Sequence, residues 1–360
     1  MAEQVPETKR RPSRTRMIVQ GVLSLVLVAV IFWFVFKGID FAQVWAAIRA
    51  MTWLELTTLF IVAVWNLATY AFVWMAVTPG LSYPHATVLT QSATAVANTV
   101  PAAGAPIGIG MTYAMLGSWG FSKSRSTLAV LVSGVWNAFA KLGLPVFALA
   151  LVALQGHVSA ARVTAALIGI GGLVAAVLVF AAMLRSEEGA RRVGQLAGRL
   201  ASRCLRLVGR PPVKGWELAT TKFRVRTIGL ISSRWVWITV TSVVSHLSLY
   251  AVLLLALRHV GVSNADVSWA EVLAVFAFAR LATAVPVTPG GVGVVEAVLI
   301  GGLVAAGGAK AEVVAAVLVF RALTWLLPIP VGVGTYLWWR KQSLSPATQE
   351  ASDLLEVQAR

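Results

Sequence analysis

The sequence predicts an all-α fold: a polytopic integral membrane helical bundle with two re-entrant helical hairpins in an inverted repeat. The first observation is composition, because 58% of the residues are hydrophobic and 12% are charged, against about half and a quarter in soluble domains. The second is that several continuous apolar runs exceed the roughly 20 residues that a helix needs to cross a bilayer; a β-barrel would show alternation instead. The third is that two further apolar segments are broken by proline and glycine, and these are the predicted hairpins.

The net charge of +16 comes mostly from basic residues in short segments that flank the apolar runs. Such flanks hold loops on the cytoplasmic side and attract anionic lipid headgroups. No RNA- or DNA-binding motif accompanies them, so nucleic acid is not an expected partner. Cys204 is the single cysteine, and no cluster of cysteine and histidine has the spacing of metal ligands. We therefore expect no metal and no cofactor.

The N-terminal part of the chain is predicted to hold two spans. Residues 1–16 are basic, contain proline and are expected to be disordered. Met17–Phe36 is too long for the apolar core of a signal peptide, so it is interpreted as a retained first span. Apolar residues recur at helical spacing in Gly38–Met51, which suits an amphipathic helix at the membrane interface. Trp53–Val77 is the second span.

The first predicted hairpin covers residues 85–118. This segment is apolar but is broken at Pro101, within the run PAAGAPIGIG (101–110). Two further spans are predicted after it, at Ser126–Leu154 and Val163–Leu184.

The largest polar segment, residues 185–234, is rich in arginine and lysine and is expected to be a cytoplasmic loop. Helical periodicity in Arg191–Leu207 predicts a short amphipathic helix within it. A span is predicted at Trp235–Leu257. The second hairpin covers residues 270–308 and is broken at PVTPGG (286–291).

The last span is predicted at Glu312–Trp338, and residues 341–360 are expected to form a flexible cytoplasmic tail, so that residues 17–340 are one membrane domain. Basic flanks place both termini and the segment 185–234 in the cytoplasm. Counting the crossings then requires the first hairpin to begin and end inside and the second to begin and end outside. Two hairpins of opposite orientation, each between two spans, are typical of inverted-repeat transporters.

A short internal match agrees with this plan. Ala-Asn-Thr-Val-Pro at 97–101 resembles Ala-Thr-Ala-Val-Pro at 282–286, and aligning the two prolines places Gly108 opposite Gly293. A match of small residues also arises by chance, but the count of crossings is independent of it.

The second break predicts a functional site. Non-helical backbone inside lipid persists only where protein buries it or where it lines a wet cavity. Pro286 and Pro289 cannot continue a helix, and Gly290, Gly291 and Gly293 permit positive φ. The helix that follows offers an N-terminus that can receive an anion such as a lipid phosphate. The alternative for an isolated proline or glycine is a kink or close helix packing.

Glu296 lies in the first turns of that helix. An ionised residue costs about 2.5–3.5 kcal/mol to insert at mid-helix, whereas complementing the helix dipole returns only about 0.3–1 kcal/mol. Glu296 therefore needs a partner, a proton or water. Arg280 and Arg321 are candidate partners because both lie at the predicted membrane depth. The set could act as a structural clamp, contact a substrate directly, or do both.

Weaker candidates in the first half are Asn98, Pro101, Asn137 and Lys141. Lys141 is either a functional cation within a span or a residue whose stem extends toward the surface. Asn66 and His246 are expected to join helices through hydrogen bonds. No nucleophile elbow, pair of catalytic carboxylates, zinc signature or nucleotide-binding loop is present, so the chain is not expected to be an enzyme.

The second half carries a pattern that resembles a known family. It consists of Arg280, Pro286, Pro289-Gly290-Gly291, Gly293, Glu296 and Arg321. This pattern is similar to that of the lysylphosphatidylglycerol synthase transmembrane-region family, and the resemblance extends over about residues 17–340. It implies a polytopic fold with re-entrant segments and the transfer of lipids across the bilayer, with aminoacylated phosphatidylglycerol as the lipid in the best-known members.

Two departures accompany the resemblance. The synthase domain of those members has no counterpart in this sequence, so aminoacyl transfer is not expected. Many relatives carry an acidic and a basic residue after the proline of the first hairpin, whereas residues 101–116 here carry no charge.

The expected function is that of a lipid flippase-like transporter, which moves a phospholipid with a polar headgroup across the cytoplasmic membrane. Its expected partners are membrane phospholipids, and a membrane enzyme or a second copy of the chain is left open as a protein partner. The uncharged first hairpin also leaves open a non-transporting scaffold for an envelope-synthesis enzyme. An ion-coupled carrier of small solutes is a third alternative.

Overall fold

The computed structural model describes residues 26, 29–30, 33, 37–100, 104–156, 160–207, 216–283 and 288–343. Within these ranges the secondary structure is helical and no β-strand is present, which confirms the all-α prediction. Residues 1–16, most of the predicted span Met17–Phe36 and most of the tail 341–360 lie outside the described residues.

In the first half of the chain the described helices are α2 (Phe41–Arg49), α3 (Trp53–Val77), α4 (Tyr83–Thr99), α5 (Gly104–Ser118), α6 (Lys123–Leu154) and α7 (Ala160–Arg185). The Asp40 carboxylate accepts a hydrogen bond from the N–H of Ala42 at 2.9 Å and so caps α2. Thr52 and Glu55 form a capping box at the start of α3, which has the bounds predicted for the second span. The interruption between α4 and α5 lies at the predicted break.

The second half contains α8 (Glu187–Leu207), α9 (Trp216–His259), α10 (Trp269–Ala282), the 3₁₀ turn η1 (Pro289–Gly291), α11 (Val294–Ala305), α12 (Lys310–Arg321), the π-helix η2 (Ala322–Leu326) and α13 (Pro328–Ser343). Two features differ from expectation. The segment 185–234 is largely helical, because it consists mainly of α8 and the first turns of α9. The helix that contains the span expected from Trp235 begins at Trp216, and its candidate membrane-spanning stretch begins at Phe223. The last span is not one continuous α-helix, because η2 lies between α12 and α13.

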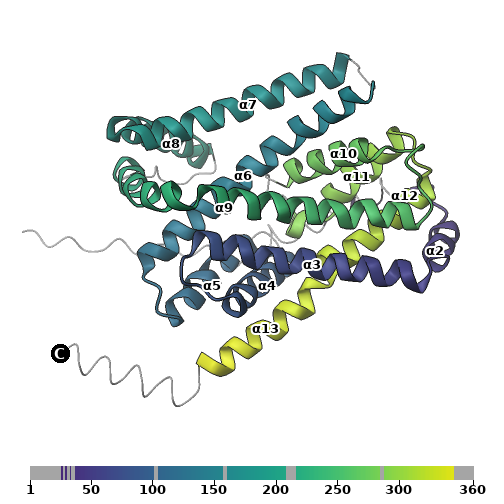
Figure 1. Ribbon diagram of the computed structural model, residues 1–360, viewed down its shortest axis with the longest axis horizontal. Helices are drawn as coiled ribbons and strands as arrows, with labels where there is room; N and C mark the ends of the chain where they lie inside the picture. Colours follow the sequence, from purple (N-terminus) through teal and green to yellow (C-terminus); the bar gives the residue numbers. More distant parts are fainter. Residues whose placement is uncertain are drawn as a thin grey trace, which may run out of the picture.

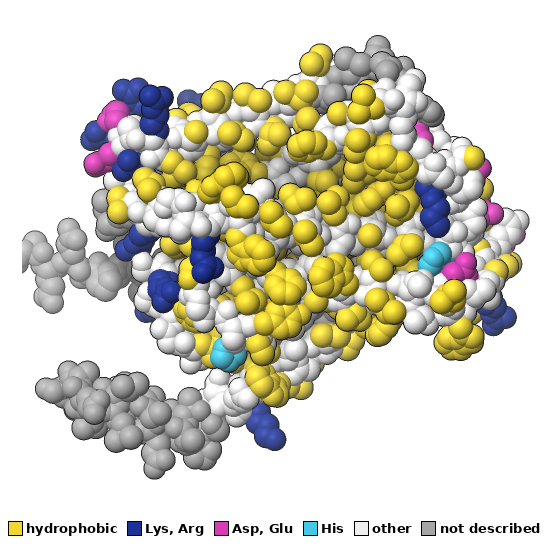
Figure 2. Space-filling view, in the orientation of Figure 1, with side chains coloured by type: hydrophobic (Ala, Val, Ile, Leu, Met, Phe, Trp, Pro, Cys, Tyr) yellow, Lys and Arg dark blue, Asp and Glu magenta, His cyan; other side chains and the backbone are white. Residues whose placement is uncertain are grey.

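Five of the described helical stretches are long and apolar enough to cross a membrane: Trp53–Val77, Lys123–Leu154, Leu167–Arg185, Phe223–His259 and Lys310–Ser343. Hydrophobic side chains cover the middle of the molecule in Figure 2, and charged side chains gather toward its two ends. The long helices α3 and α9 run along the same axis (Figure 1). The protein is therefore a multi-pass membrane protein.

The helices pack across the two halves of the chain. α3 packs on α9, α4 packs on α13, and α6 packs on α10. Asn66 joins α3 to α9 as predicted, because its Nδ2 donates to the hydroxyl of Ser248 at 2.7 Å and to the carbonyl of Ser245 at 3.2 Å. The same prediction for His246 is wrong, since its Nδ1 bonds the carbonyl of Ser242 in the preceding turn of α9.

Two helical hairpins occupy opposite ends of the molecule. α4 and α5 form one hairpin, in which Gly104 lies against Ala97 and Gly108 lies against Ala93. α10 and α11 form the other, in which Gly302 lies against Val275. In Figure 1 the first hairpin lies at the lower left and the second at the right. Their tips approach each other, because α4 contacts η1.

Candidate functional site

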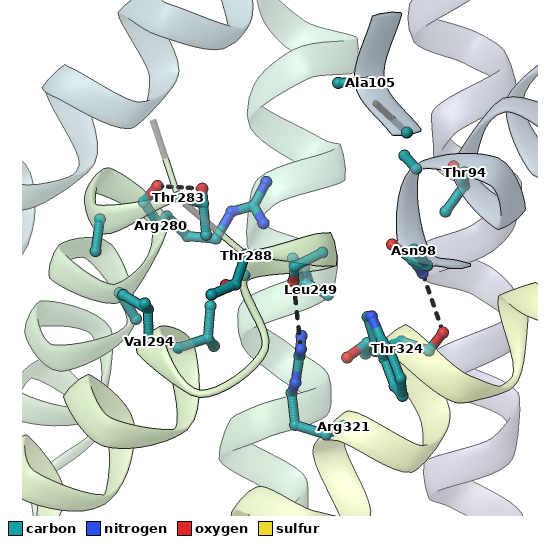
Figure 3. Close-up of a pocket in the computed structure, with 18 of the residues that line it drawn as sticks. Thr94, Asn98, Ala105, Leu249, Arg280, Thr283, Thr288, Val294, Arg321 and Thr324 are labelled. Carbon is teal, nitrogen blue, oxygen red and sulfur yellow. Dashed lines mark hydrogen bonds between the residues drawn. The ribbon is translucent and has the colours of Figure 1, made fainter. Parts of the chain in front are cut away.

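A cavity of about 630 Å³ lies where the tips of the two hairpins meet. Residues of α4 and α5 line one part of it, residues of α10, η1 and α11 line another, and α3, α6, α9, α12 and η2 complete the wall. Figure 3 shows Arg280 projecting from α10 toward the space between the hairpins, with Asn98 on the opposite side. Side chains that are far apart in the sequence therefore share one space.

Glu296 holds a hydrogen-bond network beside this cavity. Its Oε1 accepts a hydrogen bond from Nε of Arg321 at 2.7 Å, and its Oε2 accepts one from the backbone N–H of Gly293 at 2.7 Å. Arg321 also donates from Nη2 to the carbonyl oxygen of Gly290 at 3.3 Å. The side chains of Glu296 and Arg321 are only 5% and 12% exposed. A buried carboxylate is thus paired with a buried guanidinium, as buried charges require.

This network is a structural clamp, because it joins the glycine loop, the start of α11 and the end of α12. It also bears on the expectation that the N-terminus of α11 receives an anion such as a lipid phosphate. The N–H of Gly293 points to the carboxylate of Glu296, so the protein itself supplies an anion at this helix end. This N–H group is therefore already paired within the protein.

The loop at η1 packs so closely against its neighbours that only glycine fits at Gly290. Its φ is +56°, and an added Cβ would collide with the indole of Trp325 and would lie 3.0 Å from Oδ1 of Asn98. Gly291 follows with a φ of +72°. Side chains rarely adopt these backbone angles. The absence of a side chain thus lets the second hairpin touch the first hairpin and the last span.

The π-helix η2 presents Trp325 to this loop. The N–H of Leu327 donates to the carbonyl of Ala322 at 2.8 Å, which is the wide turn of a π-helix. The carbonyl of Trp325 accepts a hydrogen bond from Nδ2 of Asn98 at 3.0 Å. An amide of the first hairpin therefore pairs with the backbone of the last span. Irregular turns of this kind are frequent at functional sites.

Arg280 and Lys141 also line the cavity, and within the described part of the chain neither side chain forms a hydrogen bond or an ion pair. The Nε atom of Arg280 is buried without a partner among the described residues. The hydroxyl of Thr288 and the indole N–H of Trp325 are also buried without a hydrogen-bond partner among the described residues. Both residues line the cavity. Buried donors of this kind normally have partners, and these three groups have none among the described residues.

The sequence-predicted residues fall into several groups. Arg280, Gly290, Gly291, Arg321, Asn98 and Lys141 line the cavity, while Glu296 and Gly293 belong to the clamp and Pro289 begins η1. Asn137 is exposed on α6 and is not among the described residues that line the cavity. Pro101 and Pro286 lie outside the described residues.

Sequence reasoning missed Thr288 and Trp325. Trp325 follows Arg321 by four residues, which places both on one helix face, and this spacing could have identified it. Thr288 lies between the two prolines of the break, so its position was also a usable signal. Within the described ranges, no three His, Cys, Asp or Glu side chains are grouped in a way that could hold a metal ion.

The chain was compared with known proteins and protein families. No curated protein matches it. A family model described as the lysylphosphatidylglycerol synthase TM region matches residues 21–332, which include both hairpins, the clamp and every cavity-lining residue named above. The chain therefore belongs to the lysylphosphatidylglycerol synthase transmembrane-region family.

Proposed function

We propose that this protein is a lipid flippase-like transporter, which moves a phospholipid with a polar headgroup across the cytoplasmic membrane. The observation that carries the proposal is the cavity at the meeting point of the two hairpins, with Lys141, Arg280 and Arg321 in its wall. Cations inside a membrane protein are costly and usually mark the path of a substrate or ion. A phosphate group is the anion that every phospholipid would bring to them.

The lengths of the hairpin helices support a re-entrant arrangement. α4, α5, α10 and α11 have 17, 15, 14 and 12 residues, which corresponds to about 18–26 Å at 1.5 Å per residue. The hydrocarbon core of a bilayer is about 30 Å thick. Each hairpin would therefore enter the membrane and return to the same side, and the irregular backbone of η1 would line a polar cavity.

The packing of the helices supports an inverted repeat. We take α3, α4, α5 and α6 as one half and α9, α10, α11 and the stretch from α12 to α13 as the other. In this correspondence α3 matches α9, α4 matches α10, and α6 matches the stretch from α12 to α13. The packing of α4 on α13 then corresponds to that of α10 on α6, and α3 packs on its own counterpart, α9. In transporters of this design the two halves move against each other around a central site.

The size and borders of the cavity suit a headgroup rather than a whole lipid. Its volume of about 630 Å³ is within the range of about 300–1,000 Å³ that holds small ligands. Ile109 of α5 lines the cavity and is 48% exposed, so apolar surface continues from the cavity to the outside of the bundle. The headgroup would enter the cavity while the acyl chains stay in lipid.

The orientation belongs to the same proposal. α8 contains several arginines, among them Arg192 and Arg199, and the end of α13 carries Arg340 and Lys341. Basic residues next to spans favour the cytoplasmic side. Both termini and α8 would then be cytoplasmic, and the loop between α9 and α10 would lie outside.

Reconstitution tests this function. Purified protein is inserted into liposomes that contain phosphatidylglycerol with a fluorescent acyl chain, and dithionite then bleaches only the lipid that reaches the outer leaflet. We expect bleaching of both leaflets in vesicles with wild-type protein and of one leaflet in empty vesicles. Glu296→Gln, which breaks the clamp, should fall to the level of empty vesicles. Wild-type protein that performs no better than empty vesicles would contradict the proposal.

A further inference from the structure

The cavity has an unbalanced charge. Three of its described lining residues are basic: Lys141, Arg280 and Arg321. None of its described lining residues is acidic. The neighbouring segments 101–103 and 284–287, which the structure does not describe, contain no charged residue in the sequence. The whole first-hairpin stretch 101–116 is likewise uncharged. None of these lining or neighbouring residues therefore supplies a carboxylate.

Arg321 is already neutralised. Its Nε donates to the carboxylate of Glu296 at 2.7 Å, and this pair is buried. Removing this arginine from the three cations leaves two, Lys141 and Arg280, without an acidic partner among the described residues. The cavity thus holds two basic side chains that no described carboxylate balances.

The unpaired polar groups of the cavity point to the same chemistry. Arginine, lysine and the indole of tryptophan can only donate hydrogen bonds. Nε of Arg280, Nε1 of Trp325 and the hydroxyl of Thr288 are buried without a partner among the described residues. The groups of Arg280 and Trp325 can only donate, and the hydroxyl of Thr288 can donate or accept. Such a set suits a ligand that is rich in acceptors, and phosphate oxygens accept strong, charge-assisted hydrogen bonds.

The same cavity would bind a lipid amine poorly. An ammonium group has three donors and no acceptor, and here it would lie beside Lys141 and Arg280 without a carboxylate to receive it. Like charges in a site of low dielectric repel strongly. In a headgroup that carries a phosphate and an added amino acid, the phosphate would therefore be attracted to these cations and the amine would be repelled by them.

From this charge inventory we infer that the cavity selects phospholipids with a net anionic headgroup that has a phosphate and no amine, and that it disfavours aminoacylated headgroups. The inference rests on the proposed lipid-transport function and names its substrate class. Arg280 is the residue that would contact the phosphate, with Lys141 as the second cation. Arg321 and Glu296 would position the loop and leave the net charge unchanged.

A binding competition tests the inference without depending on transport. Purified full-length protein is equilibrated with detergent micelles that contain equal amounts of dioleoyl phosphatidylglycerol, dioleoyl phosphatidylethanolamine and lysyl-phosphatidylglycerol, and native mass spectrometry measures the lipids retained. We expect phosphatidylglycerol to be enriched over lysyl-phosphatidylglycerol by about tenfold or more, which is the scale of one charge-assisted hydrogen bond. Phosphatidylethanolamine should lie between the two.

Matched variants assign this preference to the cavity. Arg280→Gln should remove most of the enrichment, and Arg280→Lys should retain it because the charge is kept. Arg226 is exposed on α9, outside the residues that line the cavity, so Arg226→Gln should retain the wild-type preference. A loss of the enrichment in Arg226→Gln equal to that in Arg280→Gln would mean that surface charge selects the lipid and would overturn the inference.

The two proposals fail in different ways. Retention of lysyl-phosphatidylglycerol at a level equal to or above that of phosphatidylglycerol would overturn the inferred selectivity, even if the protein moves both lipids between leaflets. Anionic enrichment together with no lipid movement in liposomes would support the selectivity and would contradict the transport function.

Discussion

The carboxylate of Glu296 is the residue-scale feature that the sequence indicates most clearly. Its position in an apolar segment required a partner, and both Arg280 and Arg321 were candidates. The structure pairs it with Arg321 and leaves Arg280 facing the cavity. The sequence could not choose between the two arginines, because the choice depends on how α11 crosses α12 and not on spacing along the chain.

Breaking the clamp should destabilise the protein. Glu296→Gln keeps an acceptor for the N–H of Gly293 but leaves the buried guanidinium of Arg321 without a counter-charge. We expect the free energy of unfolding to fall by about 3–5 kcal/mol, which would appear as a lower Tm of the purified protein in detergent. Arg280→Gln is the matched control, since Arg280 has no ion pair among the described residues, and its Tm should stay near that of wild type. Equal Tm values for wild type and Glu296→Gln would show that the pair does not stabilise the fold.

Gly290 makes a second residue-scale prediction. Gly290→Ala would place a side chain at a φ of +56° and against the indole of Trp325. We expect a loss of about 1–3 kcal/mol in the free energy of unfolding, measured by thermal unfolding in detergent. Gly301 in α11 has open space around it, so Gly301→Ala should be neutral or slightly stabilising. Unfolding of both alanine variants at the wild-type temperature would show that position 290 does not require glycine.

At the scale of elements, the sequence predicts best where local chemistry marks a boundary. α3 has the predicted bounds because Thr52 and Glu55 cap its start and a Thr-Pro-Gly turn follows its end. The start of α9 was missed, because hydropathy cannot distinguish a polar helical extension from a loop. The π-helix η2 was missed as well, because its apolar residues fit a continuous α-helix equally well.

The packing of α4 on α13 gives an element-scale prediction. A Cβ added at Gly332 would collide with the carbonyl oxygen of Gln91 and the side chain of Ala95, whereas Gly334 has no atom within 4 Å of such a Cβ. Gly332→Ala should lower the free energy of unfolding by about 1–3 kcal/mol through overpacking, and Gly334→Ala should not. Thermal unfolding of the two variants, purified side by side, checks this contrast. Equal stabilities would mean that the close approach of these helices contributes little.

At the scale of the whole molecule, counting crossings from the basic flanks predicted two broken segments of opposite orientation. The structure contains a hairpin at each of these places, and their tips meet. Counting crossings could not predict which helices pack together. In the structure, the first helix of each hairpin packs on the last span of the other half. Such pairing depends on the shape of helix surfaces, for which a single sequence offers few signals.

The proposed orientation predicts which loops face which side of the membrane. In a Cys204→Ser background, Ala265→Cys lies in the exposed turn between α9 and α10, and Arg226→Cys lies on the exposed surface near the start of α9. A membrane-impermeant maleimide added to intact cells stripped of any outer membrane should label Ala265→Cys alone. It should label Arg226→Cys only after the membrane is opened. Labelling of both positions from the same side would contradict the topology on which the inverted repeat depends.

The proposed transport requires that a lipid headgroup crosses the membrane through the cavity and contacts Arg280 there. Its most direct test is the transbilayer movement of fluorescent phosphatidylglycerol by Arg280→Gln in proteoliposomes, at a protein level and Tm matched to wild type. We expect rapid movement with wild-type protein, retained movement with Arg280→Lys and a loss to the level of empty vesicles with Arg280→Gln. Movement by Arg280→Gln at the wild-type rate would show that the headgroup does not depend on Arg280.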